Sequence, residues 1–420
     1  MPGNSLPDSE QSGDRGFYRG WWIAAACFVM AFFAWGIGFY GHGFYIVALG
    51  RTTGWPTTTL SAGVASFWLA NVAGSLLLGR LIDRYGTRPA ILYGALAMAS
   101  GCFGLAAFET GFFTSPWQLF AIFAVMGTAY PGLSAMAISA SLIPWFKRRL
   151  GLALGIGLTG ASVGGAVMPP LMNYLTAAKG FGATMVTIGA VLLLSALPIV
   201  AFVIRSPKHE EAERECVDND TSDSSAPSPG LSLFLADTRF WLITLAAMLS
   251  LGAQVGFLMH QIPLLQDSLG LSGAAIAAGL AAASGAIGRF VLGLLSSRFP
   301  LASLAAGCYL IQGVGLLLVL LGDTPLLLYA ASAIAGCVIG CITMLPPLLL
   351  VDSFGAKGYG TAYGATGAAM FAMGSVATAV SGWLFDVTGD YQVPLCIMLA
   401  LHLAASLLIL WHGRRRRAQR

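Results

Sequence analysis

The chain has 420 residues, of which 57% are hydrophobic and only 10% charged, and its formal net charge is +4. Soluble domains carry about 25% charged residues, so a water-soluble fold of this length would lack the ionisable groups that cover a surface. The composition therefore excludes an ordinary cytosolic enzyme, a nucleic-acid-binding protein and a disordered chain.

Twelve apolar runs are long enough to cross a membrane, since a helix needs about 20 apolar residues to span ~30 Å of hydrocarbon. The runs are rich in Ala, Gly and Leu and lack the alternation of membrane strands, so we expect helices. In chain order the expected helices cover residues 20–48, 59–82, 89–107, 117–143, 150–173, 181–203, 240–266, 274–296, 301–321, 326–350, 359–384 and 393–411. The predicted fold class is an all-α membrane protein with twelve transmembrane helices.

The segments between and beyond these runs predict the domain organisation. Residues 1–16 start with acidic rather than basic residues, so we expect a disordered cytoplasmic tail and not a signal peptide. Residues 204–238 are acidic and of low complexity, which predicts a flexible cytoplasmic linker. We therefore expect six-helix bundles over 17–203 and 239–412, followed by a basic cytoplasmic tail over 413–420.

Basic residues predict the orientation. With the N-terminus in the cytoplasm, the inner segments hold 19 of the 22 Lys and Arg residues, and the outer segments hold only Arg51 and Lys179. The remaining one, Arg289, lies inside an expected helix. This asymmetry follows the positive-inside rule, so we expect both termini in the cytoplasm and a multi-pass protein of the plasma or inner membrane.

No signature of an enzyme is present. The sequence has no HExxH, CxxC or P-loop pattern and no embedded pair of carboxylates. Cys337 and Cys341 lie one helical turn apart, but no His or carboxylate joins them, so packing between helices is favoured over a metal site. We expect no catalytic residues, no metal and no cofactor.

Residues 79–88 read GRLIDRYGTR and join the second and third expected helices. The glycines permit a tight turn, and Asp83 can pair with cations or cap a neighbouring helix at the inner face. The segment resembles the G-x-L-x-D-R-x-G-x-R signature of the major facilitator superfamily. Breaking such pairs would help the inner side to open, so we expect a conformational latch. Its candidate residues are Gly79, Asp83, Arg84, Gly86 and Arg88.

Two further segments narrow the resemblance. Residues 18–22 read YRGWW at the start of the first expected helix, and residues 145–153 read WFKRRLGLA before the fifth. Both are similar to the monocarboxylate transporter and oxalate–formate antiporter branch of the superfamily. The resemblance implies twelve helices in two bundles, a central substrate site, and alternating access by rocking of the bundles.

Arg289 is the only Lys, Arg, Asp or Glu well inside any expected span. Such a group costs about 2.5–3.5 kcal/mol on insertion scales, and no acidic residue lies three or four positions away. One interpretation is a cavity-facing anion site, and the alternatives are a structural pair or a side chain that snorkels to the inner end, roughly 10 Å away. In the branch that this chain resembles, an arginine of the eighth helix binds the substrate carboxylate, which suits a forked guanidinium.

Three differences from these transporters limit how far their site residues can be assigned to this chain. Gly285 stands where animal monocarboxylate transporters typically carry an acidic residue, the first helix lacks their lysine, and residues 359–384 lack the second cation of the oxalate exchanger. One fixed positive charge therefore favours a monovalent organic anion over a dicarboxylate.

Other polar residues are candidates for the substrate site. Tyr40, His42, His260 and Gln261 lie in the outer parts of the first and seventh helices, and Tyr130 lies near the middle of the fourth. A histidine titrates near neutral pH, so His42 or His260 are candidates for proton coupling, and a structural bond to a backbone carbonyl is the alternative. The Tyr130 hydroxyl is placed to donate to a carboxylate or to pack against a buried partner.

These features predict a secondary transporter of small organic anions, with monocarboxylates favoured, by proton symport or anion exchange. Its partners would be the substrate anion, protons and the lipid bilayer, with no nucleic acid. A major facilitator exporter of drugs or other metabolites is the alternative within transport, and a non-transporting membrane nutrient sensor is the alternative of another class.

Overall fold

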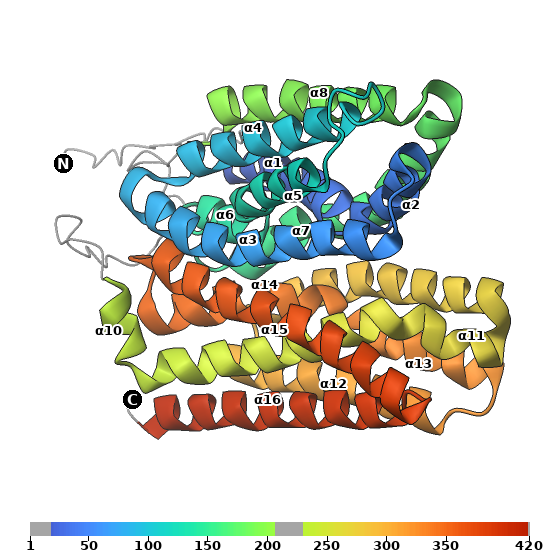
Figure 1. Ribbon diagram of the computed structural model, residues 1–420. Coiled ribbons are helices and arrows are strands. Elements are labelled where there is room, and N and C mark those ends of the chain that lie inside the picture. Colours follow the sequence, from blue (N-terminus) through green and yellow to red (C-terminus); the bar gives the residue numbers. More distant parts are fainter. Residues whose placement is uncertain (1–17, 206–229, 419–420) are drawn as a thin grey trace, which may run out of the picture.

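The computed structural model describes residues 18–205 and 230–418, and all regular structure in these ranges is helical (Figure 1). The expected tail over 1–16 and most of the expected linker lie outside the described residues. Twelve helical segments of the described chain are long and apolar enough to span a membrane, which confirms the predicted helix number.

The helices form two layers, with those before the linker in one and those after it in the other (Figure 1). The first layer contains α1 (Gly20–Gly38), α2 (Gly41–Thr53), α3 (Thr57–Tyr85), α4 (Thr87–Ala106), α5 (Pro116–Ala129), the 3₁₀ turn η1 (Tyr130–Gly132), α6 (Ala135–Leu142), α7 (Leu150–Lys179), α8 (Phe181–Pro198) and the π turn η2 (Ile199–Val203). The second contains α10 (Leu231–Leu235), α11 (Thr238–Leu295), α12 (Leu301–Leu321), α13 (Pro325–Cys337), α14 (Ile339–Phe354), α15 (Tyr359–Thr388) and α16 (Gln392–Ala418).

Three of the expected single helices are interrupted. The first breaks at Phe39 and Tyr40, between α1 and α2. The fourth breaks at η1, where Pro131 has no N–H to donate to the helix ladder. The tenth breaks at Val338, between α13 and α14. Conversely, α11 contains both the seventh and eighth spans, which meet at Gly270 with a φ of 71° that only glycine adopts readily.

The most extensive contacts between the two layers are those of α3 with α15 and of α7 with α11, and α14 also contacts α6 and α7. We name the end of the molecule that carries Tyr85, Leu150, Leu295 and Tyr359 the α10 end, because α10 lies there (Figure 1). A Cβ at Gly79 would collide with the carbonyl of Gly360. The layers are therefore closely packed at the α10 end.

Large apolar side chains cover the outside of both layers. Leu69, Leu194, Ile287 and Leu407 are each at least two-thirds exposed. A soluble protein would bury such a surface, whereas in a membrane it faces hydrocarbon. Ile287 lies on α11 only two residues before Arg289, so the lipid-facing side of this helix is known, and Arg289 points away from it.

Candidate functional site

Arg289 projects from α11 into the contact between the two layers, and only 4% of the residue is exposed. Its Nη1 atom donates to the carbonyl of Leu158 at 2.7 Å and to the hydroxyl of Ser162 at 3.0 Å, both on α7. Ser162 lies twelve residues into α7, or roughly 18 Å from the α10 end. The guanidinium therefore points toward the middle of the protein and does not snorkel to the nearer surface.

The positive charge of Arg289 has no negative partner among the described residues. Its Nε atom donates to the carbonyl of Gly340 at 3.2 Å, so all of its observed acceptors are neutral. No described Asp or Glu forms an ion pair with it, and no described group accepts a hydrogen bond from Nη2. A buried cation in a low-dielectric interior is costly without a counter-charge. The Nη2 edge of the guanidinium is available to an anion that would supply this charge.

Gly340 forms the floor beneath this guanidinium. A Cβ at this position would lie 2.5 Å from Nε and 2.7 Å from Cζ of Arg289. Gly340 is the second residue of α14, directly after the break at Val338. The absence of a side chain here leaves room for the guanidinium to approach the backbone of α14 and donate to the Gly340 carbonyl.

Tyr40 packs against α7, the helix that also supplies acceptors to Arg289. It occupies the break between α1 and α2, where its ring packs against Gly165 of α7. Gly165 and Ser162 are three residues apart and share one helix face. The Tyr40 ring and the Arg289 guanidinium therefore lie against the same strip of α7.

A set of aromatic rings connects the two layers. Trp68 of α3 stacks on Phe371 of α15, with ring centroids 5.6 Å apart and planes 23° from parallel. Tyr130 packs edge-on against Phe371 at 5.9 Å, and its buried hydroxyl has no hydrogen-bond partner among the residues that the structure describes. Trp68 and Phe371 were not predicted, because nothing distinguishes them in a chain with 24 Phe and 10 Trp residues.

The two predicted histidines do not lie with Arg289. His42 is enclosed by aromatic rings of the first layer, including Phe67 at 4.6 Å and Trp68 at 5.5 Å between centroids, and no described group forms a hydrogen bond with its Nε2 atom. His260 lies 3.2 Å from the Tyr391 hydroxyl and 3.2 Å from the carbonyl of Thr378. Because a carbonyl only accepts, Nε2 of His260 carries the proton, and this histidine joins α11 to α15.

Gln261, the neighbour of His260 on α11, is buried. Its Nε2 atom has no hydrogen-bond partner among the described residues. Of the predicted substrate-site residues, the structure therefore places Tyr40 on the strip of α7 that Arg289 contacts, Tyr130 in the aromatic set and His42 against Trp68 of that set, while His260 joins α11 to α15.

Asp83 joins the two layers at the α10 end. Its carboxylate accepts hydrogen bonds from the backbone N–H groups of Gly360 at 2.7 Å and Thr361 at 2.6 Å, in the first turn of α15. A helix N-terminus carries free N–H groups and a partial positive charge, so a carboxylate is stabilised there. The capping role that the sequence suggested for Asp83 thus spans the interface of α3 and α15.

Of the other candidate latch residues, Gly79 lies at the α3–α15 contact. The remaining three form a turn or make contacts within the first layer. Gly86 turns the chain between α3 and α4 with a φ of 79°. Arg84 lies 5.2 Å over the ring of Tyr85. Arg88 donates to the carbonyl of Ile204 and, at 3.4 Å, to that of Ala201.

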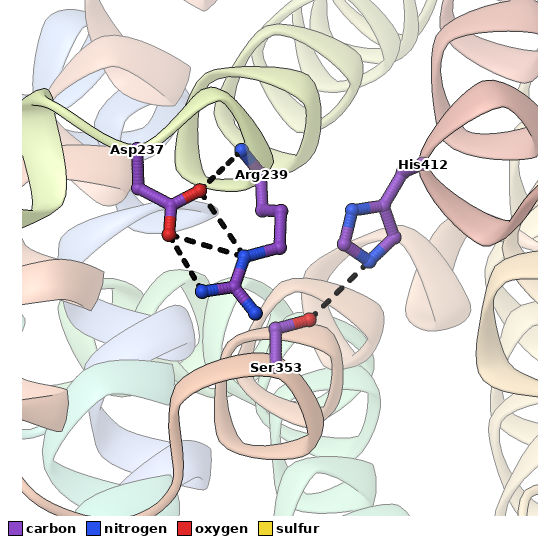
Figure 2. Close-up of polar contacts among 4 residues, drawn as sticks. All are labelled: Asp237, Arg239, Ser353 and His412. Atoms are coloured by element: carbon purple, nitrogen blue, oxygen red, sulfur yellow. Dashed lines mark hydrogen bonds and ion pairs between the residues drawn. The ribbon is translucent and has the colours of Figure 1, made fainter. Parts of the chain in front are cut away.

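A second polar cluster lies at the α10 end of the second layer (Figure 2). Asp237 caps α11 and forms an ion pair with Arg239 at 2.7 Å. Hydrogen bonding to Arg239 holds the pKa of the Asp237 carboxyl below its ordinary value of 3.8. Beside them, His412 of α16 lies 3.3 Å from the hydroxyl of Ser353 on α14. The cluster connects the ends of three helices and does not contact Arg289.

The described residues contain no group of three or more His, Cys, Asp or Glu that is placed to hold a metal ion. The Sγ atoms of Cys337 and Cys341 lie 3.1 Å and 3.8 Å from the carbonyls of Ile334 and Cys337, respectively. Both thiols are thus within hydrogen-bond distance of helix backbone.

Comparisons with known proteins agree with this architecture. The chain is 27% identical to monocarboxylate transporter 13 of Bos taurus over 81% of its own length and 78% of the relative's. It is 26% identical to a probable sulfoacetate transporter of Cupriavidus necator over 83% of both chains. It is also 28% identical to the agnestins efflux protein of Paecilomyces divaricatus, over 53% of this chain and 48% of that one. The matches to this and two other fungal transporters cover less than half of each relative's length.

The fold has a close counterpart among solved structures. The outward conformation of the transporter FucP superposes with a TM-score of 0.71 at 17% sequence identity, covering 94% of this chain and 99% of that one. The sequence profile of the Major Facilitator Superfamily matches residues 22–379. With twelve membrane-spanning helices in two layers, and the profile matching most of both, this chain belongs to the Major Facilitator Superfamily.

Proposed function

We propose that the protein is a secondary transporter of small monovalent organic anions, with monocarboxylates as the preferred class. The observation that carries this proposal is the buried guanidinium of Arg289, which no described carboxylate neutralises and whose Nη2 edge has no described protein acceptor. A substrate carboxylate would supply the missing negative charge. The likeness to a monocarboxylate transporter and a probable sulfoacetate transporter supports an anionic substrate.

We further propose that the α10 end faces the cytoplasm, as the distribution of basic residues suggests. The layers are in contact at this end through Asp83 and Gly360 and through Gly151 and Ser296. In alternating access, one bundle rocks against the other around a central site. Substrate would then reach Arg289 from the far end in this conformation, by proton symport or by exchange for another anion.

The test is uptake of radiolabelled short monocarboxylates, such as acetate, lactate and benzoate, into vesicles containing the purified protein. Arg289→Gln keeps a donor for the Leu158 carbonyl but removes the charge. Removing one partner of a buried charge pair costs about 3–5 kcal/mol, so this variant should lose uptake by at least a hundredfold. Arg289→Lys keeps a charge without the fork and should retain part of the activity.

Arg80→Gln is the matched control, because Arg80 is an exposed arginine of α3 outside the site. Its uptake should equal that of the wild type. Each variant must also melt at the wild-type temperature, so that lost uptake is not lost folding. Full monocarboxylate uptake by a folded Arg289→Gln protein would reject the assignment of Arg289 to the substrate.

Export of apolar metabolites is the second candidate function. The half-buried rings of Trp68 and Phe371 between the layers favour it, as does the likeness to the agnestins efflux protein. An exporter of this kind would move uncharged hydrophobic compounds out of preloaded cells. Because such cargo has no carboxylate, Arg289→Gln would leave its efflux unchanged, which separates the two functions.

A further inference from the structure

A groove of about 500 Å³ runs along the contact between α7 and α11 at the α10 end. It lies outside the site around Arg289, and both layers contribute to it. Its lining includes Arg149 and Leu152 from the first layer, and Val291, Leu294, Ser297 and Arg298 from the second. The groove thus spans a boundary across which the two halves move relative to each other in this family's fold.

The groove is positively charged. Arg149 directly precedes α7, and Arg298 follows the end of α11 by three residues, so both lie where the helices leave the apolar layer. Among the described residues, neither side chain has a hydrogen bond or an ion pair, and the lining contains no carboxylate. Two unpaired like charges facing one groove repel each other, and a bound anion would remove that repulsion.

An apolar stripe continues from this charged end toward the membrane interior. Ile287, Val291 and Leu294 follow each other at spacings of four and three residues, which places them on one face of α11, and Arg298 lies just beyond the end of this helix. Ile287 is 67% exposed, Val291 44% and Leu294 46%. This face of α11 is therefore an exposed apolar surface next to two arginines. An acyl chain attached to an anionic headgroup fits this combination.

We propose that this groove binds the phosphate headgroup of an anionic phospholipid, with one acyl chain along Val291 and Leu294. Basic pockets between transmembrane helices are known to suit such headgroups. The backbones of α7 and α11 approach closely here, since a Cβ at Gly293 would lie 2.9 Å from the carbonyl of Gly151. A lipid held by Arg149 and Arg298 together bridges the two layers and stabilises their contact at the α10 end.

The test titrates the full-length protein in detergent with phosphatidylglycerol or phosphatidylcholine and counts bound lipids by native mass spectrometry. One basic residue near an anionic lipid surface contributes about 1 kcal/mol, so Arg149→Gln/Arg298→Gln should weaken the tightest phosphatidylglycerol site by roughly thirtyfold. Arg149→Lys/Arg298→Lys keeps both charges and should bind within about threefold of the wild type. Phosphatidylglycerol should also raise the melting temperature of the wild type more than that of the glutamine pair.

The matched control is Arg148→Gln/Arg414→Gln, which removes the same charge from the same end of the molecule. These arginines line a separate cavity of about 1160 Å³ and not the groove, so this variant should keep the tight site. Equal loss of binding in the control and in the glutamine pair would overturn the proposal in favour of general surface charge. Unchanged binding by the folded glutamine pair would overturn it as well, as would displacement of the lipid by inorganic phosphate at the same concentration.

Discussion

Replacing Gly340 with alanine is expected to displace the guanidinium of Arg289 while leaving the helices in place. The added Cβ would lie 2.5 Å from Nε, 2.7 Å from Cζ and 2.8 Å from Nη2. Carbon atoms in contact normally stay about 3.5 Å or more apart. Because the colliding atoms are the far end of a flexible side chain, the arginine should move and the backbone of α14 should not.

The size of the effect follows from these distances. The guanidinium must move away from Gly340 by about 1 Å, which lengthens the 3.2 Å bond from Nε to the carbonyl of Gly340 beyond hydrogen-bond range. A hydrogen bond to a charged group is worth about 1.5–3 kcal/mol. A displacement of this size can also cost about a hundredfold when it misplaces a binding group. The KM for a monocarboxylate should therefore rise roughly 10- to 100-fold.

The assay is the concentration dependence of monocarboxylate uptake into vesicles, measured together with the melting temperature. Gly279→Ala is the control, because a Cβ at this helical glycine meets no other atom within 4 Å. This control should transport normally and melt at or slightly above the wild-type temperature. An unchanged KM in Gly340→Ala would refute the idea that the floor of the site positions Arg289, and a large fall in its melting temperature would refute the idea that only the side chain moves.

Two other predictions concern the α10 end. Asp83→Asn keeps only one acceptor oxygen, so it leaves one of the two N–H groups of α15 without an acceptor, which should cost about 1–2 kcal/mol and lower the melting temperature by several degrees. Asp83→Glu should restore part of this loss, and an unchanged melting temperature in Asp83→Asn would contradict the capping role. The lowered pKa of Asp237 predicts a stabilisation that is fully present above its ordinary pKa of about 3.8 and is lost as the pH falls through the lower folded value. The Asp237–Arg239 pair is partly exposed, so the effect should stay below about 1 kcal/mol. The melting temperature of the wild type should fall more than that of Asp237→Asn between pH 5 and pH 3, and parallel curves would count against this reasoning.

The sequence alone determined the features that depend on residues close together along the chain. Apolar length predicted all twelve spans, because a helix must satisfy its own backbone while it crosses hydrocarbon. A single charge in an apolar run identified Arg289 as unusual for the same reason. The glycines and the carboxylate of residues 79–88 predicted a turn and a cap, and the turn at Gly86 and the hydrogen bonds of Asp83 have this form.

Only the tertiary structure decided which distant residues meet. Arg289 finds its acceptors 131 residues away at Leu158 and 51 residues away at Gly340, and the lipid groove needs one arginine from each layer. The breaks at Tyr40 and Val338 leave no mark in the apolar pattern, which predicted single long helices there. Local periodicity records which face of a helix is apolar, but helix rotation and the pairing of the two layers depend on contacts between segments far apart in the chain. For that reason the sequence identified the buried charge, and the fold determined which groups surround it.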